Sequence, residues 1–202
     1  MAVIAGTAPP GSAGSLDALR RTGEGFAVSF QDELDLLTMF TVTPKGNLDI
    51  RRLVKGMSNG YPKGLLELID EFVIREVDHA GKCLAFELPT SCGFHILRAV
   101  ETCLKGFCYA KTGTLPPTQN RNWGQYIDYL KNAGVHSDII DVLRVLKTKR
   151  NPLMHPTDIL EIDEAISLVC LCQAGIEVII DDVRRQSLEI KFKEALTKMP
   201  TL

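Results

Sequence analysis

The chain has 202 residues, of which 45% are hydrophobic, 24% charged and 6% aromatic, and its formal net charge is -2. This length suits one domain, or a domain with a small appendage, and the composition excludes collagen-like, disulfide-scaffold and wholly disordered chains. The near-zero net charge gives no global attraction for nucleic acid, so any basic site has to be local.

The cysteines and the apolar segments indicate where in the cell the protein is expected. The six cysteines lie in apolar, helix-like runs such as residues 102–108, where a free thiol packs as a small core residue. No basic segment followed by a long apolar one opens the chain, and polar residues interrupt the longest apolar stretch, residues 165–180. We therefore expect a cytoplasmic protein with reduced thiols and no membrane span.

The first 63 residues are predicted to lie outside the main body. Residues 1–15 are rich in Ala, Gly, Pro, Ser and Thr, which predicts a flexible tail. Residues 16–63 are expected to form an N-terminal arm or small subdomain. Within it, residues 26–30 alternate like a short strand, residues 32–39 resemble a short helix, and several glycines then mark turns.

From Gly64 onward the pattern is helical. Apolar residues recur at spacings of three and four from Leu65 to about residue 85, and Pro89 is expected to end this helix and open the next, which ends near Gly113. Three more helices are predicted over residues 123–133, 137–149 and 163–196. The fold class is therefore all-α, a bundle of about five helices over residues 64–200.

Residues 144–156 differ from ordinary bundle sequence. The first half carries four cations and no acid: Arg144, Lys147, Lys149 and Arg150. At a helix end these cations complement the helix dipole. Proline follows both Asn151 and His155, and the residue before a proline avoids the α region. We therefore expect the helix to break there and a short, stiff turn to hold Arg150 and His155 in fixed relation.

An arginine and a histidine so placed suit phosphodiester chemistry. Arg150 offers a planar fork of donors to phosphate oxygens and can stabilise the charge of the transition state. Histidine titrates near neutral pH, so His155 can take a proton from a ribose 2′-hydroxyl or give one to a leaving 5′-oxygen. Such a pair requires no metal, and no cysteine and histidine ligands occur at zinc-finger spacing. We expect neither a metal nor another cofactor.

Residues 150–155 resemble the R-N-x-x-x-H motif of HEPN domains, which lies between the last two helices of their bundle. Residues 85–101 are also similar to a bacterial HEPN-like protein of unassigned function. The similarity covers roughly residues 65–185, so the resemblance implies a HEPN-like helical bundle.

The resemblance implies a metal-independent endoribonuclease that works as a homodimer, in which two motifs face one composite RNA cleft. Carried over to this chain, it assigns phosphate binding to Arg150, general base or acid catalysis to His155, and orientation of the turn or of a phosphate oxygen to Asn151. A further polar residue is expected on an earlier helix, and Glu101 and Arg98 are the two candidates. The expected RNA contacts are Lys147, Lys149, Arg98 and Arg144.

Many HEPN proteins act as toxins or in antiviral defence against phage, and some are paired with nucleotidyltransferase antitoxins. The partners that the resemblance implies are therefore RNA, a second copy of the chain and a protein antitoxin. Other family members have lost catalysis, which leaves a non-catalytic binding or protein-interaction module as the alternative function.

Several of these polar residues also have a simple structural interpretation. Arg98 and Glu101 are three residues apart, so an ion pair within one helix is their default role. His95 is expected to be structural, and the sequence shows no partner for His79. A Cys108–His155 nucleophile pair is disfavoured, because nothing marks that thiol as activated.

Overall fold

The computed structural model describes residues 12–35, 42–117, 121–153 and 159–198, and these residues are helical wherever they are regular. Within these ranges the only β-type pairing is an isolated bridge between Lys45 and Leu48. The all-α prediction is confirmed, but the described residues form nine α-helices and one 3-10 helix rather than about five helices. None of the described helices is long and apolar enough to cross a membrane.

The chain divides into two units, Met1–Thr41 and Val42–Leu202. The first contains α1, Ser12–Asp35. The predicted strand at residues 26–30 is therefore wrong, since this segment is helical. Its alternation also fits a helix, because Phe26 and Phe30 are one turn apart and their rings stack with centroids 5.9 Å apart.

Helix α1 also includes the end of the predicted flexible tail, from Ser12 onward. The remaining residues of that tail, 1–11, lie outside the described residues. The short helix expected over residues 32–39 coincides with the end of α1 up to Asp35, and its last four residues again lie outside the described part.

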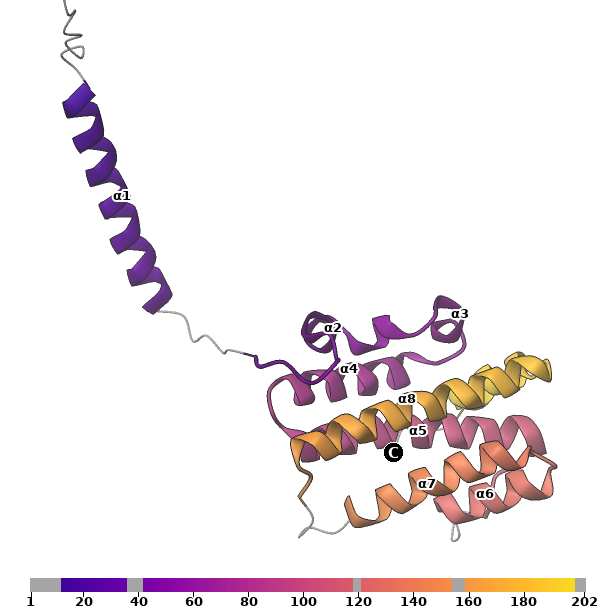
Figure 1. The fold of residues 1–202 in the computed structure, drawn as a ribbon. Coiled ribbons are helices and arrows are strands. Elements are labelled where there is room, and N and C mark those ends of the chain that lie inside the picture. Colours follow the sequence, from indigo (N-terminus) through magenta and orange to yellow (C-terminus); the bar gives the residue numbers. More distant parts are fainter. Residues whose placement is uncertain (1–11, 36–41, 118–120, 154–158, 199–202) are drawn as a thin grey trace, which may run out of the picture. The chain divides into compact units, whose positions relative to one another are not determined.

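The second unit is a helical bundle arranged around α5 (Figure 1). Its elements are α2 Ile50–Lys55, η1 Met57–Gly60, α3 Lys63–Leu66, α4 Glu71–Ala85, α5 Pro89–Thr112, α6 Trp123–Asn132, α7 Ser137–Leu153, α8 Ile162–Arg185 and α9 Glu189–Lys198. Helix α5 contacts α4, α6, α7, α8 and α9, while α7 packs against both α6 and α8. The sequence predicts five apolar residues at helical spacing along α5. Four of them, Leu97, Val100, Leu104 and Phe107, are buried, whereas Phe94 is 40% exposed.

Residues 42–63, assigned from the sequence to an N-terminal arm, belong to the same unit as the bundle. Helix α2 packs closely on α4, because a Cβ placed on Gly81 would lie 2.7 Å from Met57 Cβ and 3.0 Å from the Leu53 carbonyl oxygen. Leu53 and Met57 are themselves buried. The sequence does not reveal this packing, because the glycines and prolines of the segment indicate turns and its helices are too short to show a clear apolar period.

Three predicted helix limits need correction. The helix expected from Gly64 is interrupted, and α4 starts afresh at Glu71, where the side chain of Asp70 accepts a hydrogen bond from the Val73 backbone N–H. The predicted last helix is two helices, since α8 ends at Arg185 and α9 begins at Glu189. Ser187, between them, has a φ of 53°, which a continuous right-handed helix does not allow.

The third correction concerns the site-bearing segment. The helix expected to break at Asn151-Pro152 continues to Leu153 as α7. Pro152 removes one backbone donor, which leaves one carbonyl a turn earlier without its helical partner, and α7 ends one residue later. Arg150 is therefore a helical residue, and the predicted turn cannot begin before residue 154.

Candidate functional site

The last turns of α7 bring Arg150 against α5 and α6. Its Nη2 lies 3.7 Å from Oε2 of Glu101 on α5. Its guanidinium carbon lies 6.0 Å from the ring centroid of Trp123, the first residue of α6. These distances fit an ion pair slightly too long for a direct hydrogen bond, and a weak cation–π contact. The Arg150 side chain is 27% exposed, so it is not fully enclosed by these neighbours.

Glu101 is the centre of this group. One of its oxygens, Oε2, accepts a hydrogen bond of 3.0 Å from the indole Nε1 of Trp123, and the other, Oε1, lies 2.9 Å from Lys105 Nζ. Burial alone would raise the pKa of Glu101. The hydrogen bonds from Trp123 and Lys105, with the charges of Lys105 and Arg150, outweigh burial and hold this pKa below its ordinary value. Glu101 is thus a partly buried carboxylate with Trp123, Lys105 and Arg150 around it.

The candidates next to Arg150 in the sequence are only partly described. Asn151 is exposed. His155 lies outside the described residues.

The predicted RNA contacts on α7 separate into two groups. A Cβ placed on Gly124 would lie 3.0 Å from Lys147 Nζ, so this ammonium is beside the first turn of α6, one residue from Trp123. Lys149 is exposed. Arg144 is instead paired with Asp141, with 3.1 Å between Nη1 and Oδ1. Lys147 is therefore the predicted contact closest to the Arg150 group, while the charge of Arg144 is already countered.

Arg98 does not join this group. The ion pair expected between Arg98 and Glu101 does not form, because Arg98 Nη1 lies 3.3 Å from Oε2 of Glu76 on α4. Glu101, three residues further along α5, turns instead to α6 and α7. Arg98 and Glu101 were expected to share one face of α5, but their side chains contact different helices.

Two members of the group were missed from the sequence, Trp123 and Lys105. Lys105 follows Glu101 by four residues, the spacing of an ion pair within a helix, and that signal was available. Trp123 is the single tryptophan and follows a capping asparagine, Asn122, which marks the start of a helix. Its contact with Glu101 depends on the packing of α6 on α5, which no local pattern specifies.

The thiol alternative loses support from the structure. Cys108 is buried, and burial raises the pKa of its thiol to about 11. A thiol with this pKa is almost wholly protonated at neutral pH, whereas nucleophilic cysteines have lowered values. Cys108 is therefore a core residue rather than an activated nucleophile.

Comparisons with known proteins provide no relative. The chain matches no protein-family model, no curated protein and no solved structure. A functional assignment therefore depends on the residues and geometry described above.

Proposed function

We propose that the protein is a HEPN-type, metal-independent endoribonuclease whose site is built around Arg150 and His155. The observation that supports this most is the position of Arg150, which begins the R-N-x-x-x-H pattern in the last turns of α7 and lies next to Glu101 of α5. Glu101 is one of the two residues that the sequence suggests as the additional polar group; the other, Arg98, lies against Glu76 instead. An arginine that lies beside a carboxylate and keeps part of its side chain exposed suits phosphate binding.

The proposed reaction moves one proton at each step. His155 takes the proton of a ribose 2′-hydroxyl, and the 2′-oxygen attacks the adjacent phosphorus. Arg150 binds the non-bridging oxygens and stabilises their growing negative charge. The bond to the 5′-oxygen breaks, and a protonated imidazole of the composite dimer site returns a proton to that oxygen. The products are a 2′,3′-cyclic phosphate and a 5′-hydroxyl.

In this proposal Glu101 is a positioning residue. It orients the guanidinium of Arg150 through Nη2, which lies 3.7 Å from Glu101 Oε2. Lys147, beside the start of α6, and the exposed Lys149 supply additional cations for the backbone of a bound RNA. Binding that depends on such phosphate contacts weakens steeply with added salt.

The test is cleavage of a labelled structured RNA in the presence of EDTA. His155→Ala is expected to slow cleavage by about a hundredfold or more, because it removes general acid–base catalysis. His136→Ala is the matched control, since His136 is exposed and precedes α7, and it should cleave like the wild type. Arg150→Ala should weaken both RNA binding and turnover, and Arg150→Lys should restore only part because a lysine cannot bind bidentately.

The chemical ends of the cleaved RNA and the activity of His155→Ala test the proposed mechanism. End-group analysis should find a 2′,3′-cyclic phosphate. Equal rates for His155→Ala and wild type would remove His155 from the mechanism. Growth arrest on expression in bacteria, lost in His155→Ala, is the expected result if the RNA target is cellular and the protein acts as a toxin.

A non-catalytic binding module is the second candidate. It is favoured by the ion pair of Arg150 with Glu101, which already gives the guanidinium a structural role, and by the net charge of -2. Under this alternative, neither the wild type nor His155→Ala cleaves RNA, although both form the dimer. Arg150→Ala then lowers stability and leaves RNA binding unchanged.

A further inference from the structure

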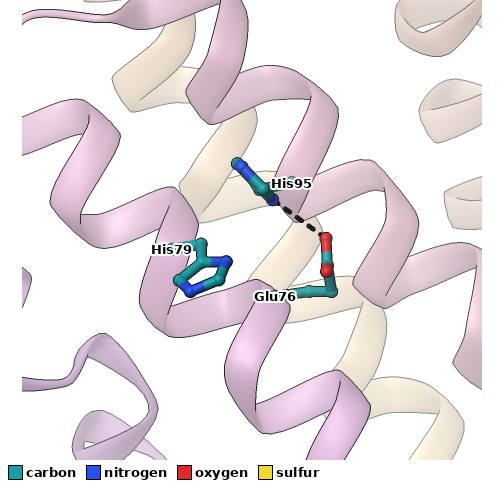
Figure 2. Close-up of side chains that lie close together, drawn as sticks. All are labelled: Glu76, His79 and His95. Atoms are coloured by element: carbon teal, nitrogen blue, oxygen red, sulfur yellow. Dashed lines mark hydrogen bonds and ion pairs between the residues drawn. The ribbon is translucent and has the colours of Figure 1, made fainter.

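A second polar group lies between α4 and α5. Glu76 and His79 are three residues apart on α4 and so share a face, which turns toward His95 of α5 (Figure 2). His95 Nδ1 lies 2.9 Å from Glu76 Oε2, and one ligand atom of each residue lies within 4.8 Å of the other two. The rings of His79 and His95 meet edge to face with centroids 5.1 Å apart.

A purely structural explanation covers only part of this group. Glu76 is buried, with 4% of its side chain exposed, and a buried carboxylate requires partners. His95 and Arg98 supply them, since each lies within 3.3 Å of Glu76 Oε2. His79 is not needed for that purpose. Within the described part of the chain, its imidazole contacts the ring of His95 and makes no hydrogen bond.

Two imidazoles and one carboxylate form a donor set suited to Zn²⁺. With three protein ligands, zinc keeps a fourth position for water or substrate. Donor atoms around a tetrahedral zinc are about 3.4 Å apart, as zinc–nitrogen bonds of about 2.0–2.1 Å require. The ligand atoms lie within 4.8 Å of one another, so zinc binding would draw them together by about 1.4 Å or less.

We propose that Glu76, His79 and His95 form a Zn²⁺ site that bridges α4 and α5 and leaves one coordination position open. Zn²⁺ takes the place of any proton on the ligating nitrogen of each histidine, and that proton is released to solvent. The site uses none of the residues of the proposed ribonuclease centre, so either proposal can fail alone.

Arg98 gives the proposal a distinctive consequence. Its guanidinium competes with a cation for Glu76, from 3.3 Å, and the positive charge opposes that of zinc. The Arg98 side chain is 47% exposed and also lies over the ring of Phe72, so it can turn toward solvent when zinc binds. Removing its charge should therefore strengthen zinc binding, whereas removing an ordinary packing residue should not.

The experiment is titration of the chelator-treated full chain with Zn²⁺, followed by calorimetry and by competition with a chromophoric zinc indicator. The wild type should bind zinc at this site and unfold at a higher temperature with zinc than without it. His79→Ala and His95→Ala should each weaken binding by about tenfold or more. His136→Ala should bind like wild type, and Arg98→Gln should bind more tightly.

Two further measurements keep the outcome clear. Far-ultraviolet circular dichroism has to show that the histidine variants retain their helices, so that lost binding reports lost ligands. Co²⁺, used in place of zinc, should give a spectrum without a thiolate charge-transfer band, because no cysteine belongs to the site. A thiolate band, or equal zinc affinity for wild type and His79→Ala, would overturn the proposal.

Discussion

Breaking the buried ion pair between α5 and α8 should destabilise the bundle more than any surface change. Lys111 Nζ lies 2.7 Å from Asp182 Oδ2, and the two side chains are only 6% and 8% exposed. Gln186 donates to the same carboxylate at 3.3 Å, and Lys111 Nζ lies 5.4 Å from the centroid of the Phe107 ring. In Lys111→Met the carboxylate stays buried and loses its cation.

The expected loss is about 3–5 kcal/mol of the free energy of unfolding, the usual cost of leaving one member of a buried pair uncompensated. For a domain of this size that corresponds to roughly 10 °C in Tm. Replacing both charges, in Lys111→Met with Asp182→Leu, should recover most of the loss, because well-packed apolar groups often replace a buried pair at little cost.

The assay is urea unfolding followed by circular dichroism at constant pH. Arg144→Met is the control, because Arg144 forms an exposed pair with Asp141. The Arg144 side chain is 50% exposed and that of Asp141 is 66% exposed. Such pairs contribute about 1 kcal/mol at most. If Lys111→Met unfolds within about 1 kcal/mol of wild type, the pair is not buried in solution and the reasoning is refuted.

Three further predictions follow from other contacts. The pKa of Glu101 is lowered in the folded protein, so its charge stabilises the fold at any pH above the pKa of the unfolded state. This stabilisation is lost as the pH falls through the pKa of the folded state. In acid unfolding curves, the difference in stability between wild type and Glu101→Gln should therefore shrink below about pH 4. Gly81→Ala should lower the free energy of unfolding by about 1–3 kcal/mol in urea, since its Cβ meets Met57 and the backbone of Leu53. Gly60→Ala is the control, because its Cβ meets one atom at 3.6 Å, and its stability should change little. A thiol reagent should label the exposed Cys170 first in the native protein, with buried thiols reacting only on unfolding; fast labelling of all six would contradict the buried packing.

The helical character of the chain and several helix limits follow from local sequence. Proline at the first position marks the start of α5 at Pro89, and Gly113, with a φ of 71°, closes it as the left-handed residue after a helix. The spacing of apolar residues identified the buried face of α5 except at Phe94, which is exposed. These signals are local, because they depend on backbone preferences and on residues within two turns of one another.

The tertiary structure decided which faces meet. Nothing near Arg98 in the sequence shows that it pairs with Glu76 rather than with Glu101, which is three residues away. The neighbours of Glu101 come from α6 and α7, and the close approach of His79 to His95 depends on how α4 lies along α5. A helical pattern specifies which side chains share a face. Only the packing of helices against each other selects the groups across from that face, since many sequences of equal periodicity would pack differently.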